Sequence, residues 1–496
     1  MGSTASKPSE RTRDNRKVQK YDYHSDEESL YNNITEKMNY LGIDNDLKKY
    51  EAAPVALSHV KAWEQDLLSD RKNLLTINAL THNAIPEVIK STPNITKDTV
   101  EVWNVQIPLE GSPVTNQKSS GRCWMFASTS CFRVAYMKKF NLEKFELSQN
   151  YLFFYDKLEK ANYLLTNIIE TADLDLDSRV VQAILGNGLS DGGQWDMIVN
   201  LVSKYGLVPK TIYQDSYHAT NSSPMNYVLV NKLKEYALVL RKLVEKGSSK
   251  EQVLKVKKAQ IQEIYNILAL TLGPPPKPDE DFTWDYKDKS GAVYSKTLTP
   301  KAFSELVDLG IHTSFSLIND PRNEYYKLYT VDRLNNVVGG KPIDYVNVPI
   351  EDITDAVVTA LKAGYPVFFG SDVGKFSERG SGILDTNAFD YELAFNTKLN
   401  LTKAERLEVG SSAMTHAMVI TAVHIVDGEV QRYRIENSWG EDAGNKGYFV
   451  ASQDWFKEYV YQVVTYVKLA PKELTKIWRK GDYTVLPIYD PMGALA

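Results

Sequence analysis

A chain of 496 residues with 43% apolar residues can bury a large core, and its length predicts two to four structural units. The formal net charge of −5 is small for this length, so any surface that attracts nucleic acid or an anionic membrane would have to be local. No run of about 18 apolar residues is present to span a bilayer, and the first residues lack the apolar core of a secretory signal.

The two cysteines, Cys123 and Cys131, lie in a segment expected to be helical, where their separation is too large for a disulfide. A chain without disulfides or a secretory signal is expected in the reducing cytoplasm. A mitochondrial location or membrane attachment stays open, because Met1, Gly2 and Ser6 match the pattern for N-myristoylation and basic residues follow.

The first half of the chain predicts a polar tail followed by helices. Residues 1–50 hold too few large apolar residues for a core and predict a disordered tail. Residues 51–225 predict a mainly helical half, with turn-forming residues 119–121 just ahead of a helix from Trp124 to about Lys139. Cys123 is therefore expected at the start of a helix.

Residues 226–340 predict a helical insertion and linker. Two long helices are expected between 226 and 270, with a break at 247–249 and an end at the Gly-Pro-Pro-Pro run 273–276. Residues 226–260 contain nine Lys or Arg against three Glu. Such a run usually forms a solvated helix face, and weak nucleic-acid binding through this basic hairpin is the alternative.

The second half predicts strands. Segments between 341 and 470 alternate apolar and polar residues with a period of two, which is typical of a β-rich half. Residues 471–496 predict a C-terminal arm, and in its last stretch, 483–496, Pro487 and Pro491 oppose a helix and favour extended chain. The expected fold class is α+β.

Cys123 is the candidate nucleophile. A thiol attacks as the thiolate, and a helix N-terminus with a neighbouring imidazolium lowers its pKa. Gln117 lies shortly before it, and the Gln117 side-chain amide together with the Cys123 backbone N–H can stabilise an oxyanion. Cys131 lies inside the same helix among apolar residues and is expected to be structural.

His416 is the candidate base. Of the seven histidines, only His416 and His424 fall on an evident strand. A two-residue hairpin predicted at Asp427-Gly428 makes His416 face Trp439 and brings it diagonally beside Asn437, whose amide oxygen can orient the imidazole. His424 lies about 26 Å along the strand and is expected to be structural.

Three further residues complete the candidate site. Trp439 is expected to cover the hydrogen bond of the imidazole, with an ordinary core tryptophan as the alternative. Gly192 and Gly193 offer bare backbone to an extended substrate, with a plain turn as the alternative. The chain has no HExxH, CxxC or dinucleotide-binding motif, so no metal and no cofactor are expected.

Three motifs resemble the active-site motifs of papain-like cysteine peptidases: QKSSGRCWMFA at 117–127, MTHAMVIT around His416, and NSWG at 437–440. Within that superfamily, FELSQNYLFFYDKLEKANY, SLINDPRNEY and the terminal LPIYDPMGALA resemble the bleomycin hydrolase family, and the similarity runs from about residue 55 to the end. The resemblance implies a papain-like fold with a helical left domain, a β-barrel-like right domain, an inserted helical hairpin and a C-terminal arm. It also implies a homohexamer.

The same resemblance implies a cytosolic cysteine aminopeptidase that acts on peptides and aminoacyl compounds through a Cys-His-Asn acyl-enzyme mechanism. Hydrolysis of the amide in bleomycin and of homocysteine thiolactone belongs to that expectation. In the family the C-terminal arm lies in the cleft, and here its last carboxylate, on Ala496, is expected to meet the free amine of the substrate. Two alternatives remain open: a nucleic-acid-binding scaffold that uses the basic hairpin, and a cysteine acyltransferase.

Overall fold

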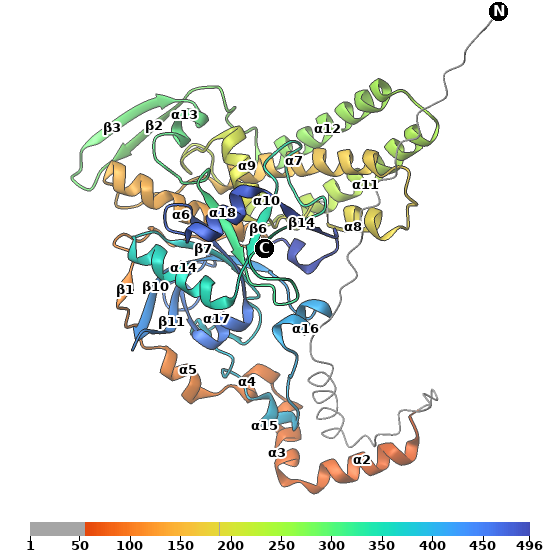
Figure 1. The fold of residues 1–496 in the computed structure, drawn as a ribbon, viewed down its shortest axis with the longest axis vertical. Coiled ribbons are helices and arrows are strands. Elements are labelled where there is room, and N and C mark those ends of the chain that lie inside the picture. Colours follow the sequence, from red (N-terminus) through yellow and green to blue (C-terminus); the bar gives the residue numbers. More distant parts are fainter. Residues whose placement is uncertain (1–54, 188) are drawn as a thin grey trace, which may run out of the picture. The chain divides into compact units, whose positions relative to one another are not determined.

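The computed structural model describes residues 55–187 and 189–496, and Figure 1 labels their helices and strands. The described residues divide into two units, 55–78 and 79–496. The predicted tail of residues 1–50 and its myristoylation pattern lie outside the described residues. Within the part that is described, no helix is both long and apolar enough to cross a bilayer.

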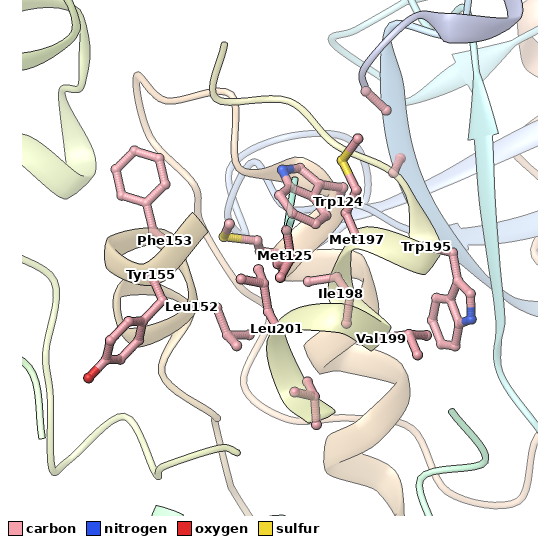
Figure 2. Close-up of a cluster of buried hydrophobic side chains, with 14 of the residues drawn as sticks. Trp124, Met125, Leu152, Phe153, Tyr155, Trp195, Met197, Ile198, Val199 and Leu201 are labelled. Carbon is pink, nitrogen blue, oxygen red and sulfur yellow. The ribbon is translucent and has the colours of Figure 1, made fainter. Parts of the chain in front are cut away.

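Three helices, α6, α7 and α9, pack together in the helical half of the larger unit. Helix α6 (Cys123–Phe140) packs against α7 (Gln149–Glu170) and α9 (Trp195–Tyr205), and Figure 2 shows their buried side chains interlocking. Ser148 begins α7, because its hydroxyl accepts the Tyr151 N–H. The other helices of the chain up to residue 222 are α2 (Leu57–Ser69), α3 (Arg71–Leu80), α4 (Ile85–Ile89), α5 (Thr92–Asp98), α8 (Arg179–Asn187) and α10 (Tyr217–Thr220).

The helical insertion consists of α11 (Ser223–Glu245) and α12 (Lys250–Leu272), so the predicted break near residue 248 is confirmed. Two of its basic side chains point into the helical layer. Arg241 donates to the Thr171 carbonyl at 3.0 Å, and Lys257 donates to Thr166 Oγ1 at 2.5 Å. The basic surface is therefore smaller than the count of charges suggests.

A twelve-stranded mixed sheet forms the other half, in the order β14-β5-β6-β4-β13-β7-β10-β11-β12-β9-β8, with β1 also paired to β10. Over the described residues the two ends of this path do not pair, so the β-rich half is an open sheet, whereas a barrel-like form was expected. Its strands are β1 (Val105–Gln106), β4 (Ser314–Ile318), β5 (Lys327–Val331), β6 (Asp344–Asn347), β7 (Val367–Ser371), β8 (Ser377–Glu378), β9 (Ile383–Leu384), β10 (His416–Val426), β11 (Glu429–Glu436), β12 (Tyr448–Ser452), β13 (Val460–Tyr466) and β14 (Tyr483–Leu486).

The β-rich half begins before its predicted boundary at residue 341. Strands β4 and β5 join the large sheet, and all five residues of β4 are buried. The sequence of β4, SFSLI, does alternate serine with apolar residues, but the run is only five residues long and was not recognised as a strand. The separate hairpin β2 (Phe282–Lys287) and β3 (Val293–Leu298) also precedes that boundary.

The hairpin β10–β11 turns at Asp427-Gly428, as predicted, and both residues have positive φ. It pairs Val426 with Glu429 next to the turn, and Val419 with Glu436 at the far end. Two irregularities in the register lie between these pairs and cancel each other. The end of β10 that carries His416 therefore lies beside the residues that follow β11.

Three helices pack on the large sheet: α14 (Ile350–Lys362), α17 (Gln453–Tyr459) and α18 (Lys472–Lys480). Of the other short helices, α13 (Pro300–Ser304) packs on α9, α15 (Tyr391–Phe395) packs on α4, and α16 (Lys403–Glu408) follows α15. The predicted arm at 471–496 thus starts with a helix, which ends at Gly481 in the left-handed conformation. The C-terminal arm, from here on residues 483–496, consists of β14, extended chain and one short 3₁₀ turn (Pro491–Gly493).

Candidate active site

Cys123 is the first residue of α6, and its side chain is 2% exposed. Helix α6 packs on β10, and the backbone amide of Ala417, the second residue of that strand, forms a hydrogen bond with the Cys123 sulfur. Cys123, His416 and Gln117 line one pocket, which we call the Cys123 pocket. The structure therefore brings the predicted nucleophile, base and oxyanion donor to one place. The other residues of this pocket are Lys118, Ser119, Ser120, Gly121, Asp191, Gly192, Ser222, Ser223, Asn226, Thr415, Leu495 and Ala496.

The imidazole of His416 is held by Asn437, as the hairpin count predicts. His416 Nε2 lies 2.9 Å from Asn437 Oδ1, and the Ser438 N–H donates to the same oxygen at 2.8 Å. Because this oxygen accepts, neutral His416 carries its hydrogen on Nε2 and keeps a lone pair on Nδ1. The Trp439 ring lies against the imidazole with a centroid distance of 4.9 Å.

Gln117 is fixed at three atoms. Its backbone N–H donates to the Ser438 carbonyl at 2.8 Å, and its Oε1 accepts from Ser438 Oγ at 2.7 Å. Its Nε2 donates one hydrogen to the Ser120 carbonyl at 2.7 Å, which leaves the second hydrogen for a ligand in the pocket. Ser438 was not predicted as a site residue, although it stands inside the NSWG motif.

Two buried lysines of α7 hold the glycine loop at the edge of the pocket. Lys157 Nζ lies 2.7 Å from Asp191 Oδ1, and Lys160 Nζ donates to the Gly192 carbonyl at 2.6 Å. Burial alone would raise the pKa of Asp191, but the ammonium of Lys157 holds that pKa below its usual range. The sequence signal that was missed is this pair of lysines, three apart and close to Asp156 on a buried helix face.

The predicted peptide-binding glycines hold the chain's own arm. The Gly193 N–H donates to the Ala496 oxygen at 2.9 Å, and the Ala496 N–H donates to the Gly193 carbonyl at 3.2 Å. A Cβ at Gly192 would lie 2.7 Å from the Leu495 carbonyl oxygen, so only glycine admits the arm at this distance. Ala496 is 4% exposed and borders the Cys123 pocket.

Burial disfavours the Cys123 thiolate and the His416 imidazolium when either charge forms without the other. It raises the pKa of the Cys123 thiol to about 11, against hydrogen bonds from the amides of Ala417, Trp124 and Cys123 itself. It also lowers the pKa of His416 to about 4, against the Asn437 hydrogen bond and with the positive charge of Arg379. A proton that passes from sulfur to imidazole creates two opposite charges together, and each stabilises the other.

The other candidates lie away from this pocket. Cys131 is buried within α6, and burial raises its pKa above the usual range of a thiol. His424 pairs with Arg432 across the β10–β11 hairpin. Among the residues that the structure describes, no group of three or more His, Cys, Asp or Glu side chains is arranged to hold a metal ion.

A cysteine at a helix start, a histidine on the sheet and an asparagine beside it form the arrangement expected of a papain-like cysteine peptidase. Residues 54–493 match the model of the Peptidase C1-like family, and the chain belongs to that family. It is a cysteine peptidase and a homologue of the bleomycin hydrolases.

The chain and bleomycin hydrolase of Gallus gallus are 43% identical over 447 residues, which cover 88% of this chain and 97% of the relative. The mitochondrial cysteine proteinase 1 of Saccharomyces cerevisiae (strain ATCC 204508 / S288c) is 41% identical over 456 residues, 90% of this chain and 94% of the relative. The crystal structure of PepW from Lactobacillus rhamnosis HN001 superposes with a TM-score of 0.87 at 41% identity, covering 90% of this chain and 100% of PepW.

Proposed function

We propose that the chain is an aminopeptidase that removes the first residue of peptides and aminoacyl compounds, with Cys123 as nucleophile and His416 as base. The observation that carries this proposal is the composition of the Cys123 pocket, which Cys123, His416 and the last residue of the arm line together. Because Leu495 and Ala496 occupy one side of this pocket, only a short stretch of substrate fits before the cleaved bond.

The reaction proceeds by acyl transfer. His416 Nδ1 takes the thiol proton, and the Cys123 thiolate attacks the substrate carbonyl carbon to form a C–S bond. The free Nε2 hydrogen of Gln117 and the Cys123 N–H hold the resulting oxyanion. When the C–N bond breaks, His416 returns its proton to the leaving amine. Water, activated by His416, then cleaves the thioester and regenerates the thiol.

Asn437 and Trp439 support the base without reacting. Asn437 accepts the Nε2 hydrogen of His416, so the ring presents Nδ1 rather than Nε2 to the sulfur. The Trp439 ring keeps water from this hydrogen bond, which strengthens it.

The arm restricts the substrate to its first residue. An extended peptide that continued past the cleaved residue toward Gly193 would occupy the space of Leu495 and Ala496. The carboxylate at Ala496 can pair with the free ammonium of a substrate that ends at that point, in a charge-assisted hydrogen bond. Gly192 and Gly193 therefore act on the substrate through the arm that they hold.

The proposal of specific substrates follows from the similarity to bleomycin hydrolases. The bleomycin amide and homocysteine thiolactone each present a carbonyl next to a free amine, and the same attack opens either bond. A cytosolic location and a homohexamer belong to this proposal, and cell fractionation and sedimentation test them. The yeast relative is named mitochondrial, so mitochondria are the compartment to compare.

Two alternative functions make different predictions. A cysteine acyltransferase would pass the same acyl group to an added amine, which analysis of the products detects. A nucleic-acid-binding scaffold would bind nucleic acid through residues 226–260 in a salt-dependent manner and hydrolyse no aminoacyl substrate.

The test compares aminoacyl fluorogenic substrates with free and acetylated amines. We expect turnover of the free forms only, and none in Cys123→Ala, with Cys131→Ala as the matched active control. Removal of Leu495 and Ala496 should permit cleavage of acetylated substrates and internal peptide bonds. An unchanged substrate profile after this truncation would refute the role of the arm.

A further inference from the structure

We infer that Gln194, Tyr345 and Asp490 are positioning residues that set how far the arm reaches into the Cys123 pocket, and thereby how many substrate residues fit before the cleaved bond. With Arg322 they form what we call the arm clamp. The inference rests on the proposed aminopeptidase function and extends it to residues outside the pocket.

The first part of the clamp holds two backbone carbonyls of the arm. Gln194 Nε2 donates to the Ala494 carbonyl at 2.7 Å and to the Met492 carbonyl at 3.3 Å. The Tyr345 hydroxyl donates to Gln194 Oε1 and lies 3.4 Å from the Met492 carbonyl oxygen. Gln194 is fully buried and Tyr345 is 1% exposed, so neither side chain has room to follow a moving arm.

The second part holds the turn that precedes those carbonyls. Asp490 Oδ1 accepts the Met492 N–H at 2.8 Å and a hydrogen of Arg322 Nη2 at 3.0 Å. Asp320, which is fully buried, binds the same guanidinium through both of its oxygens, at 2.9 and 2.7 Å. Asp320 thus fixes Arg322 independently of the arm, and Asp490 attaches the 3₁₀ turn to Arg322.

These contacts determine the register of the arm. Its backbone is bound at Met492, at Ala494 and, through Gly193, at Ala496, so Leu495 is the one residue between the last two attachments. A slide by one residue moves extended chain by about 3.3 Å, which is the length of one more substrate residue. Apart from the bonds within the arm clamp, these hydrogen bonds are made to backbone atoms of the arm. They therefore fix the position of the arm and do not depend on its side chains.

The experiment uses two clamp variants, each with a matched control. Tyr345→Phe removes only the hydroxyl, and Tyr329→Phe, at the paired position on the neighbouring strand with its hydroxyl on the Glu324 carbonyl, is its control. Asp490→Asn keeps an oxygen for the turn but removes the charge that faces Arg322, and Asp482→Asn, in an exposed ion pair with Lys480, is its control.

The experiment measures kcat/KM for two fluorogenic substrates, one dipeptidyl and one aminoacyl, and compares them as the ratio of dipeptidyl to aminoacyl. Only cleavage of the dipeptidyl substrate in one step, with release of the intact dipeptide, is counted. We expect this ratio to rise about tenfold in both clamp variants and to stay unchanged in both controls, while kcat for the aminoacyl substrate stays within about threefold. A merely structural role would lower both activities together.

Hydrogen exchange measured by mass spectrometry reports the arm directly. Exchange in the peptide that contains residues 492–496 should accelerate in both clamp variants. A faster-exchanging arm with an unchanged ratio, or an unchanged arm, overturns the inference, and Asp490→Asn alone decides if Tyr345→Phe does not fold. A wild-type chain that turns over no free-amine substrate contradicts instead the proposed function, while the exchange data still test the clamp.

Discussion

Ser438 and Gln117 are joined by two hydrogen bonds, one from the Gln117 N–H to the Ser438 carbonyl at 2.8 Å and one from Ser438 Oγ to Gln117 Oε1 at 2.7 Å. Ser438 follows the sheet strand β11, whereas Gln117 precedes helix α6, so this contact links the two halves of the fold. The neighbouring Asn437 holds His416. Two consecutive residues therefore fix both the base and the oxyanion donor.

The first prediction concerns this donor. Gln117→Ala should lower kcat about a hundredfold with little change in KM, because an oxyanion donor acts mainly in the transition state. Ser438→Ala should lower kcat less than about tenfold, since the Ser120 carbonyl still holds Nε2. Steady-state kinetics measure both, with the exposed Gln431→Ala as control. A rise in KM alone would contradict the oxyanion role of Gln117.

The second prediction concerns the two thiols. A thiol-alkylating reagent should modify Cys123, which borders a pocket and receives hydrogen bonds from three backbone amides, far faster than Cys131, whose pKa burial raises further. Peptide mass spectrometry after timed labelling gives the two rates, and turnover should fall in step with modification of Cys123. Cys123→Ala should be inactive and folded. Equal labelling of the two cysteines would exclude Cys123 as a selectively reactive nucleophile.

The third prediction concerns pH. Burial is the main cause of the lowered pKa of His416, and the charge of Arg379 lowers it further. Arg379→Gln should therefore raise the pKa of His416 above about 4 and move the acid limb of the kcat/KM profile to higher pH, by less than about one unit. Lys480→Gln removes an equal charge from an exposed ion pair and should leave the limb in place. A shift in the opposite direction would contradict this electrostatic role.

The fourth prediction concerns stability. Burial and the neighbouring Asp385 raise the pKa of Asp98 from 3.8 to about 7, so the folded state binds a proton that the unfolded state has released within this interval. The free energy of unfolding should therefore fall as the pH rises from about 4 to about 7. Asp98→Asn should flatten this slope in urea titrations, whereas Asp285→Asn, on the exposed face of β2, should preserve it. A wild-type stability that rises over this range would refute the assignment.

Sequence reasoning could find the His416–Asn437 pair because a two-residue turn sets the register of a hairpin. The Asp427-Gly428 signal is local, and one face of the hairpin must be buried, so the count is still correct at the Val419–Glu436 pair, eight residues along each strand. It holds even though the strands contain two irregularities, because the second restores the register that the first shifts. Neither irregularity is visible in the sequence.

Contacts between distant segments could not be predicted in this way. The pairing of Gly193 with Ala496 joins positions some 300 residues apart, and two glycines alone do not indicate what approaches them. The helix at 472–480 was missed because Pro487 and Pro491, which favour extended chain, lie beyond it, and Pro471, which precedes it, was not recognised as a helix start. Ser438 was missed because a serine next to a site residue has many surface roles, and only the fold brings Gln117 to it.

Trp124, the residue after Cys123, connects the start of helix α6 to the loop that holds the arm. Its indole Nε1 donates to the Asp191 carbonyl at 2.8 Å, and its ring fills the space where a Cβ of Gly193 would lie, only 2.5 Å away. The sulfur and the loop that carries the arm's end are thus attached to one rigid side chain. The arm is also anchored in the sheet, where β14 pairs with β5 and Tyr345 of β6 lies against the Met492 carbonyl. A smaller side chain at position 124 would therefore loosen the sulfur and the end of the arm together, although it contacts neither the base nor the oxyanion donor.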